Sequence, residues 1–286
     1  MNKTIYMTYK KAIPDLVCSR WKTLNKDYEI ELSLDDDCIR FLETHFNSYI
    51  ANLFKQIPVG MYKADLWRLC KLYVHGGVYA DVDMIPYLDI DTLDVSASLC
   101  TCLSKNGGAV FQAFIISKPK NPLLLQFLIS FLLNNPQQYP NGPCYDMYKC
   151  ISYTLGVPKL HPEIKYEMND VKIHVDIGTS NTNIKTIDLH YFPTDVPYTI
   201  FLHPHTYSDQ LSITLNGTRL TVKRLDANLG WGHPHSCYIS IPSKESIFFF
   251  REWLGDNDDW RTSYVMYKGT KIFDSRDMTY HNNGGW

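Results

Sequence analysis

The chain has 286 residues, of which 45% are hydrophobic and 14% aromatic, and its formal net charge is −2. This length predicts one large domain, or a domain with a small module, and the apolar content suffices for a sizeable core. Lys and Arg are scattered without runs, which argues against nucleic acid as a partner and excludes a broad nucleic-acid-binding surface.

The sequence also lacks the usual signals for membrane insertion and export. The most apolar segment, residues 123–133, is too short to span a bilayer, and a strand-like run begins near the N-terminus with no signal peptide before it. The eight cysteines form no C-x-x-C pair and no zinc-type spacing, so free thiols in a reducing compartment are expected. We therefore expect a soluble, cytoplasmic protein without a transmembrane segment.

The first predicted elements belong to an open α/β sheet. Residues 5–9 are expected to form its first strand, and a nucleotide commonly binds at the C-terminal end of such a strand. Residues 21–31 are typical of a helix end followed by a strand, and residues 36–46 of an amphipathic helix.

The most informative stretch is residues 63–86, KADLWRLCKLYVHGGVYADVDMIP. Residues 61–74 are helix formers without Gly or Pro, which predicts a helix. Gly76 and Gly77 then supply the left-handed residue that usually ends one.

An acidic pair follows this two-glycine stop. A β-type run continues to Met84, so Asp81 and Asp83 are expected at the C-terminal end of a strand, with both carboxylates facing one point. Two converging carboxylates suit Mg²⁺ or Mn²⁺, particularly when diphosphate oxygens complete the octahedron. Asp-x-Asp also occurs elsewhere in the chain, but only in polar or turn-like surroundings, at positions 35–37, 89–91 and 256–258.

The preceding helix carries a charged pair on its apolar side. At about 100° per residue, Asp65 and Arg68 fall on the side of the leucines, while Lys63 and Lys71 project from the opposite side. One interpretation is a buried ion pair that holds the helix to the sheet. Beside an acidic strand end, a polar pair that lines a ligand pocket is the better interpretation.

The second half of the chain becomes progressively richer in strands. Residues 99–103 and 109–117 are predicted strands, and residues 122–134 and 141–153 are predicted helices. From residue 171 onward the pattern is mainly β, with strands expected at 171–175, 184–192, 198–203, 237–241 and 246–250 and a hairpin over 212–222 around an Asn-Gly turn.

Several motifs of the chain resemble those of the DXD sugar transferases. The signature of that family is similar to KADLWRL…LY..GGVY.DVDM.P, its first strand to KTIYMTY (residues 3–9) and a further segment to WKTLNKDY (residues 21–28). A third segment resembles QAFIISKPKNP, with Gln112 in place of the usual Asn and Asn121 in place of a frequent His. The family includes yeast initiating mannosyltransferases, capsular-polysaccharide transferases and the glucosyltransferase domains of clostridial toxins. The resemblance covers roughly residues 1–125.

The resemblance implies a GT-A-like α/β fold, an open mixed sheet flanked by helices, with a β-rich C-terminal section. It places a nucleotide-sugar-binding catalytic core at residues 1–195. We expect a β-rich insertion or accessory module at 196–255, for acceptor recognition or structural cover, and a C-terminal tail or lid that completes the active site at 256–286.

The resemblance also implies roles for individual residues. Asp83 would bind Mn²⁺ or Mg²⁺ directly, and Asp81 would reach the metal or the ribose. Asp65 and Arg68 would hold sugar hydroxyls, and Arg68 would also be able to steady the diphosphate, so these four residues form the predicted catalytic set. Further contacts to the donor are expected from Met7, Thr8, Tyr9, Tyr79, Gln112 and Trp286.

The last six residues are similar to a segment that ends many of these catalytic cores. His281 would close the metal shell and Trp286 would face the diphosphate or sugar, although Gly285 replaces the usual Ser. A frayed polar terminus is the other interpretation, and His203 or His205 is then the rival third metal ligand.

These features together predict a metal-dependent glycosyltransferase. It would move a hexose from a UDP- or GDP-sugar to a carbohydrate or other hydroxyl acceptor, and the family implies retention of anomeric configuration. No dedicated carboxylate nucleophile stands out in the sequence. A nucleotide-sugar hydrolase and a non-catalytic glycan-binding protein are the alternatives, although a lectin has no need for the charged residues at 65, 68, 81 and 83.

Overall fold

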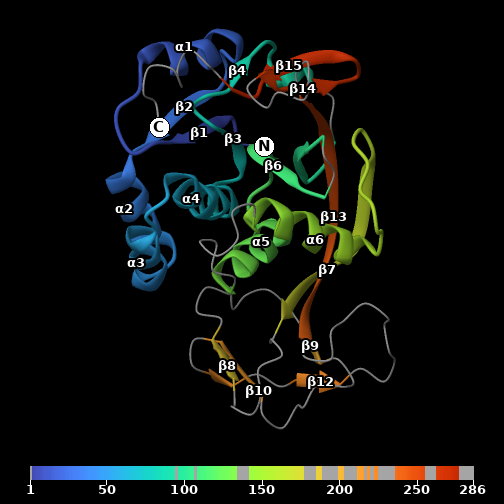
Figure 1. The fold of residues 1–286 in the computed structure, drawn as a ribbon. Helices are drawn as coiled ribbons and strands as arrows, with labels where there is room; N and C mark the ends of the chain where they lie inside the picture. The colour runs from blue at the N-terminus through green and yellow to red at the C-terminus, as the bar shows by residue number, and fades with distance from the viewer. Residues whose placement is uncertain are drawn as a thin grey trace.

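A twelve-stranded mixed sheet forms the centre of the protein (Figure 1). The computed structural model describes residues 2–93, 96–105, 108–133, 142–176, 185–188, 199–202, 211–215, 218–219, 222–224, 236–254 and 262–276. The main path of the sheet runs β2-β1-β3-β6-β5-β13-β14-β15-β4. These strands are β1 (Thr4–Thr8), β2 (Glu29–Ser33), β3 (Gly77–Ala80), β4 (Ile85–Pro86), β5 (Leu99–Leu103), β6 (Val110–Ser117), β13 (Ser236–Trp253), β14 (Tyr264–Tyr267) and β15 (Thr270–Asp274).

The strand directions are mixed, which confirms the predicted α/β class. Strand β1 pairs in parallel with both β2 and β3, and β5 pairs in parallel with β13. The pairs β3–β6, β5–β6, β13–β14, β14–β15 and β15–β4 are antiparallel.

The helices divide between the two faces of this sheet. Helix α1 (Asp15–Leu24) packs with the β14–β15 hairpin on one face, and the other face carries the remaining helices (Figure 1). Those are α2 (Asp35–His45), α3 (Ser48–Gln56), α4 (Gly60–His75), α5 (Pro122–Leu133) and α6 (Gly142–Leu155), and a short 3₁₀ helix, η1, spans Ile90–Thr92.

Two hydrophobic cores follow from the alternation of side chains along the strands. In β13, Ile247 and Phe249 join the core under the five helices, whereas Phe248 and Phe250 join the core under α1. The same alternation separates Tyr79 from its neighbours in β3, so that its ring lies on the side of α4. The position of Tyr79 on that face is what brings it to the helix that carries Asp65 and Arg68.

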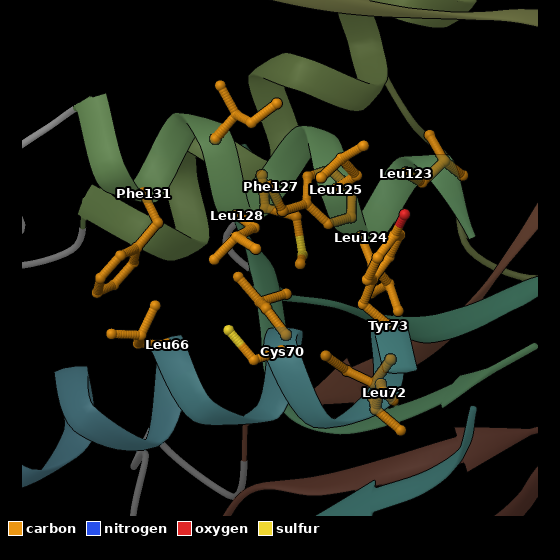
Figure 2. Close-up of a cluster of buried hydrophobic side chains, with 14 of the residues drawn as sticks. Leu66, Cys70, Leu72, Tyr73, Leu123, Leu124, Leu125, Phe127, Leu128 and Phe131 are labelled. Atoms are coloured by element: carbon orange, nitrogen blue, oxygen red, sulfur yellow. The ribbon is translucent and has the colours of Figure 1, made fainter. Parts of the chain in front are cut away.

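Helices α4 and α5 pack directly on each other (Figure 2). Leu66 and Cys70 of α4 face Phe131 and Leu128 of α5, and all four side chains are almost completely buried. Full burial of each large apolar side chain stabilises the fold by about 1.5–3 kcal/mol, so this contact fixes the orientation of α4. None of the helices in the described ranges combines the length and apolar character that crossing a membrane requires.

The opposite side of α4 is buried as well. Lys71 was expected on that side of the helix, and it is only 7% exposed. Its Nζ lies 2.8 Å from Oε1 of Glu31 and within 5 Å of the ring centroids of Tyr6 and Phe41. Helix α2 and strands β1 and β2 cover this side of α4, and Lys71 is accommodated there by an ion pair and aromatic faces.

The two-glycine stop after α4 is confirmed. Gly76 and Gly77 have φ values of 63° and 99°, a region that only glycine enters without strain. A Cβ atom on Gly76 would lie 2.6 Å from Cδ of Pro119 and 2.9 Å from the carbonyl oxygen of Ser117. The glycine is therefore required both for its backbone conformation and for the close approach of the segment after β6.

The acidic pair occupies a turn, contrary to the predicted strand run to Met84. Strand β3 ends at Ala80, and the amide of Asp81 makes a last bond across the sheet, to the carbonyl of Ala113 at 2.9 Å. The amide of Met84 then donates to the carbonyl of Asp81 at 3.2 Å, which closes a turn. The strand prediction failed because the chain must change direction here to enter β4, so strand alternation does not set the direction of the Asp83 carboxylate.

This turn joins two distant positions of the sheet. Strand β3 lies near the start of the main path and β4 lies at its end, where Pro86 pairs with Phe273 of β15. The amide of Tyr87 extends this pairing with a 3.0 Å bond to the carbonyl of Ile272. Residues 81–84 therefore close a ring of strands, and the acidic turn is held from both sides.

The β-rich C-terminal section is confirmed in part of its detail. Strand β7 (Lys165–Asp176) pairs with β13, which runs without interruption through both strands predicted at 237–250 apart from a bulge at Pro242/Glu245. The predicted hairpin is present as β10 (Leu211–Leu215) and β11 (Thr218–Arg219). The remaining strands are β8 (Lys185–Asp188), β9 (Thr199–Leu202) and β12 (Val222–Arg224).

The proposed regional division at residues 195 and 255 stays a prediction. In Figure 1, β8, β9, β10 and β12 lie away from the helices, while β13 extends from them into the central sheet. Its second half, Ile247–Arg251, pairs with β5. If 196–255 is an accessory module, it shares this long strand with the core.

Candidate active site around Arg68

Arg68 lies at the centre of a cluster of buried polar groups. It projects from the middle of α4 and is only 4% exposed. Its Nη1 donates to the carbonyl oxygen of Gln112 in β6 at 2.6 Å, and its Nε donates to the carbonyl oxygen of Ala64 at 3.2 Å. These two bonds use the fixed geometry of the guanidinium to tie the helix to the sheet.

Two carboxylates face the remaining edge of the guanidinium. Nη2 of Arg68 lies 3.2 Å from Oδ1 of Asp65 and 3.5 Å from Oδ1 of Asp81. The structure thus brings together the helix pair and the first residue of the acidic turn. Of the two interpretations of this helix pair, the structure has the buried ion pair between residues 65 and 68, and its continuation to Asp81 joins it to the strand end; the lining of a ligand pocket stays a prediction.

The charges in this cluster are strongly coupled. Burial raises the pKa of Asp65 to about 6, against the opposing effect of Arg68, and the negative charge of Asp81 raises it further. Burial acts to lower the pKa of Arg68, but Tyr79, Asp81 and Asp65 outweigh it, so the pKa is raised. Arg68 therefore stays charged and compensates two carboxyl groups at once.

Tyr79 completes the cluster from the sheet. Its ring centroid lies 4.5 Å from Cζ of Arg68, a cation–π contact, and its hydroxyl donates to Oδ1 of Asp81 at 2.6 Å. Burial raises the pKa of Tyr79 well above its usual value, so the phenol keeps its proton. Oδ1 of Asp81 is thus oriented by two donors.

Asp81 is the most accessible carboxylate of the cluster. Its side chain is 26% exposed, compared with 10% for Asp65 and 5% for Arg68. Asp83, at the other end of the turn, is 3% exposed. The cluster therefore presents Asp81 outward and keeps the groups that orient it inside.

The acidic turn offers part of a coordination sphere for a divalent cation. Carboxylate oxygens are the ligands that Mg²⁺ and Mn²⁺ prefer, and Asp81 and Asp83 are separated by one residue in a turn that both ends of the sheet hold. Within the described part of the chain, no three His, Cys, Asp or Glu side chains gather to hold a metal. By its chemistry the aspartate pair suits such a cation, with Asp83 only 3% exposed, and other oxygens or nitrogens would have to complete the shell.

The predicted donor-binding residues of β1 lie at the neighbouring strand end. The parallel register pairs Ile5 with Val78 and Tyr6 with Tyr79, so the end of β1 runs beside Ala80 and the acidic turn. Thr8 donates from Oγ1 to the carbonyl of Ser33 at 3.0 Å, and Tyr9 is 8% exposed. Met7 is completely buried, so any contribution of Met7 to a ligand would come from its backbone.

Cys144 belongs to the same neighbourhood but was not predicted. It lies in the first turn of α6, and its Sγ accepts a 3.8 Å bond from Nε2 of Gln112. Burial raises the pKa of Cys144 to about 12, with further contributions from Asp65 and Asp81. The sequence offered one signal for it, its place near the start of the helix predicted at 141–153.

Four predicted residues fall outside the described ranges. They are His281 and Trp286 in the C-terminal segment, and His203 and His205 as the rival metal ligands. Their proposed roles stay predictions.

Comparison with solved structures gives two distant likenesses. The PaToxG glycosyltransferase matches 53% of this chain and 69% of its own, at 18% identity and a TM-score of 0.41. The ligand-free glycosyltransferase domain of the YGT toxin matches 57% of this chain and 69% of its own, at 10% identity and a TM-score of 0.33. At these TM-scores, the likenesses carry no weight for function.

Curated relatives match a segment of the chain. Inositol phosphoceramide mannosyltransferase 3 of Schizosaccharomyces pombe is 28% identical over 99 residues, which are 29% of this chain and 28% of the relative. The initiation-specific alpha-1,6-mannosyltransferase of Candida albicans is 26% identical over 99 residues, 31% and 26% of the two chains. That of Saccharomyces cerevisiae is 31% identical over 90 residues, 30% and 17% of the two chains. The match thus spans less than a third of each relative.

The sequence model of the family described as "Glycosyltransferase sugar-binding region containing DXD motif" matches residues 15–99. This range includes Asp65, Arg68, Asp81 and Asp83, and it confirms the resemblance drawn from the same motifs. Residues 15–99 of the chain are therefore similar to the DXD-containing sugar-binding region of glycosyltransferases.

Proposed function

We propose that this protein is a glycosyltransferase that moves a hexose from a nucleoside-diphosphate sugar to a hydroxyl group of a carbohydrate acceptor. The observation that carries the proposal is the joint orientation of Asp81 by Arg68 and Tyr79 at the exposed edge of a DXD-containing region. The fungal relatives are named mannosyltransferases. A mannose donor therefore belongs among the first candidates, beside glucose and galactose donors.

Asp81 and Asp83 would hold a divalent cation, Mn²⁺ or Mg²⁺. When bound, this cation would act as a Lewis acid for the negative charge that builds up on the diphosphate as its bond to the sugar breaks. Tyr79 and Arg68 keep Oδ1 of Asp81 in place, which leaves its other oxygen to face a ligand. His281 is the proposed third protein ligand.

The remaining residues would bind and orient the donor. The carboxyl group of Asp65 would contact sugar hydroxyls. The positive charge of Arg68 would attract the negative diphosphate and so help to hold it in place. Tyr9, directly after β1, would lie against the base or ribose, with Thr8 and the backbone of Met7 next to it. Trp286 would close over the donor. Retention of configuration is part of the proposal, with no protein nucleophile assigned.

The test is donor turnover over a panel of UDP- and GDP-hexoses with Mn²⁺. We expect one donor to be consumed by the native chain, EDTA to abolish this activity, and Asp83→Ala to be inactive while remaining folded. Asp36→Ala removes an exposed aspartate of α2 and serves as the matched control, with native activity expected.

Two results would contradict the proposal. Consumption without transfer to any sugar in an acceptor panel, with free hexose as the only product, would identify a hydrolase. Absence of both binding and consumption of every donor by the native chain would leave the acidic turn without this role, and glycan binding by the β-rich section would then be the function to examine.

A further inference from the structure

Gln112 has a buried hydrogen-bonding group that the described residues leave without a partner. The residue is 3% exposed, and its Oε1 has no hydrogen-bond partner among the described residues. A buried amide oxygen without a partner costs about 1–3 kcal/mol, and unsatisfied groups of this kind are rare in native proteins. The unused acceptor therefore calls for an external partner.

This acceptor lies beside the Arg68 cluster. The main-chain oxygen of Gln112 binds Arg68 at 2.6 Å, and the next carbonyl in β6, that of Ala113, binds the amide of Asp81 at 2.9 Å. The side chain of Gln112 is anchored separately, because its Nε2 donates to Sγ of Cys144 in the first turn of α6. A single strand thus positions the acidic turn, the guanidinium and the unused amide oxygen.

Cys144 shares this environment. Burial raises the pKa of Cys144 to about 12. The negative charges of Asp65 and Asp81 also raise this pKa, whereas the positive charge of Arg68 lowers it. The thiol is therefore neutral at physiological pH. The neutral sulfur accepts the hydrogen bond from Nε2 of Gln112. Because it carries no charge, it does not compete with Asp65 and Asp81 as an ion-pair partner of Arg68.

We propose that Cys144 is a positioning residue for a sugar pocket. Its sulfur holds the amide of Gln112 so that Oε1 accepts a hydrogen bond from a hydroxyl group of the donor hexose. This inference rests on the proposed function. The contact of Gln112 with the donor is what the family resemblance implies, and the new element is the positioning of its amide by Cys144. A site built to hydrogen-bond a hydroxyl group rejects analogues that lack it, because its own polar group is then left unpaired.

The two side chains differ in what they can be replaced by. Cys144→Ser keeps an acceptor at nearly the same place, whereas Cys144→Ala removes it and frees the amide to rotate. Gln112→Met keeps the length of the side chain and removes the amide. Cys150→Ala is the matched control, because Cys150 lies in the same helix, is buried, and belongs to the hydrophobic core.

The experiment measures KM and kcat for the hexose donor that the native chain consumes, together with its Kd by calorimetry in the presence of Mn²⁺. We expect Cys144→Ala and Gln112→Met to raise KM and Kd by about 10-fold, with a smaller effect on kcat. Cys144→Ser should stay close to native values. Cys150→Ala should lower thermal stability and leave KM unchanged.

A second readout tests the hydroxyl group directly. Among the monodeoxy analogues of that donor, one should have a higher Kd than the full donor for the native chain. For Cys144→Ala, the same analogue and the full donor should have equal Kd values. Unchanged KM and Kd in Cys144→Ala, or equal effects of Cys144→Ala and Cys150→Ala, would overturn the positioning role while the Asp83-dependent turnover of the native chain stands. A native chain that binds no donor would overturn both proposals.

Discussion

Tyr79 donates its hydroxyl hydrogen to Oδ1 of Asp81, two residues further along the chain, at 2.6 Å. Residues two apart along a strand lie on the same face, and the amide of Asp81 still bonds across the sheet to the carbonyl of Ala113, so Asp81 stays on the face on which Tyr79 lies. The same oxygen lies 3.5 Å from Nη2 of Arg68. The turn and the buried pair on α4 therefore act as one unit.

The Tyr79 hydroxyl should contribute to activity as well as to stability. Tyr79→Phe keeps the ring against Arg68 and Trp67 and removes one bond to a carboxylate, which is worth about 1.5–3 kcal/mol. We expect kcat/KM for the donor to fall about 10- to 100-fold. Steady-state kinetics and circular dichroism would measure both properties.

Tyr28→Phe is the control for this change. Tyr28 donates to Oδ1 of Asp91 at 2.8 Å, an equivalent bond before β2 and away from the acidic turn. Its removal should lower stability and leave kcat/KM near the native value. Equal losses of activity in the two variants would show that Tyr79 acts only through the fold.

Removing one partner of the buried ion pair should destabilise the fold strongly, whereas replacing both partners by apolar residues should cost little. Arg68→Met leaves Asp65 without its countercharge, and we expect a loss of about 3–5 kcal/mol in the free energy of unfolding. Adding Asp65→Leu should recover most of this loss, because no charge of the original pair is then left unpaired. Neither variant should turn over a donor. Urea denaturation and donor turnover are the measurements.

An exposed ion pair supplies the comparison for Arg68. Nζ of Lys55 lies 3.0 Å from Oε1 of Glu43, with both side chains nearly half exposed. Lys55→Met should cost less than about 1 kcal/mol and leave activity intact. If Arg68→Met were as mild as Lys55→Met, the central role of Arg68 would be wrong.

Gly76 should tolerate no side chain. Gly76→Ala places a Cβ 2.6 Å from Cδ of Pro119 at a φ of 63°, and the conformation alone costs about 1–2 kcal/mol. We expect destabilisation above about 2 kcal/mol once the contact is included. Gly60→Ala meets nothing within 4 Å at the start of α4 and should stabilise by up to about 1 kcal/mol. Thermal unfolding of both variants would test this contrast.

His75 should make the fold sensitive to mild acid. Burial lowers the pKa of His75, and Lys71 and His45 lower it further, against the raising effect of Glu31. His75 therefore binds a proton less readily in the folded protein than in the unfolded chain, where the pKa of histidine is about 6.5. Stability should be unaffected by this group above that pH and should fall as the pH drops below it.

Urea midpoints between pH 7.5 and 5 would measure the His75 effect. His75→Gln should flatten the decline, while His161→Gln, at an exposed position, should leave it unchanged. Identical slopes in the native chain and His75→Gln would contradict the assignment.

The sequence predicts local features of the site well and their assembly less well. The helix, its two-glycine end and the ion pair between Asp65 and Arg68 follow from spacing within about ten residues, and the structure has all three. The bond from Arg68 to the carbonyl of Gln112 joins residues 44 positions apart. It depends on the antiparallel pairing of β3 with β6, which no local pattern encodes.

Lys71 shows why helical periodicity can mislead. A single helix predicts one buried stripe, but α4 is covered from two directions, so a lysine opposite the leucines is buried as well. Helix α3 was missed for a different reason. Its start depends on one cap, the bond from the amide of Ile50 to Oδ1 of Asn47, shortly after the end of α2, and no element was predicted for this stretch.

The ring of strands around the acidic turn has a consequence for biosynthesis. Tyr87 follows the turn closely, yet its hydroxyl binds Asp274, which is 187 residues further along the chain. A ribosome adding about 5–20 residues per second exposes β3 and the aspartates well before β15 exists to pair with β4. During that interval, the edge at β4 is open and the N-terminal half has hydrophobic surface to protect. Strand β15, the last strand among the described residues, is then the one that holds the earliest part of the proposed site, so late translational errors or stalling would affect the acidic turn before they affect the helices.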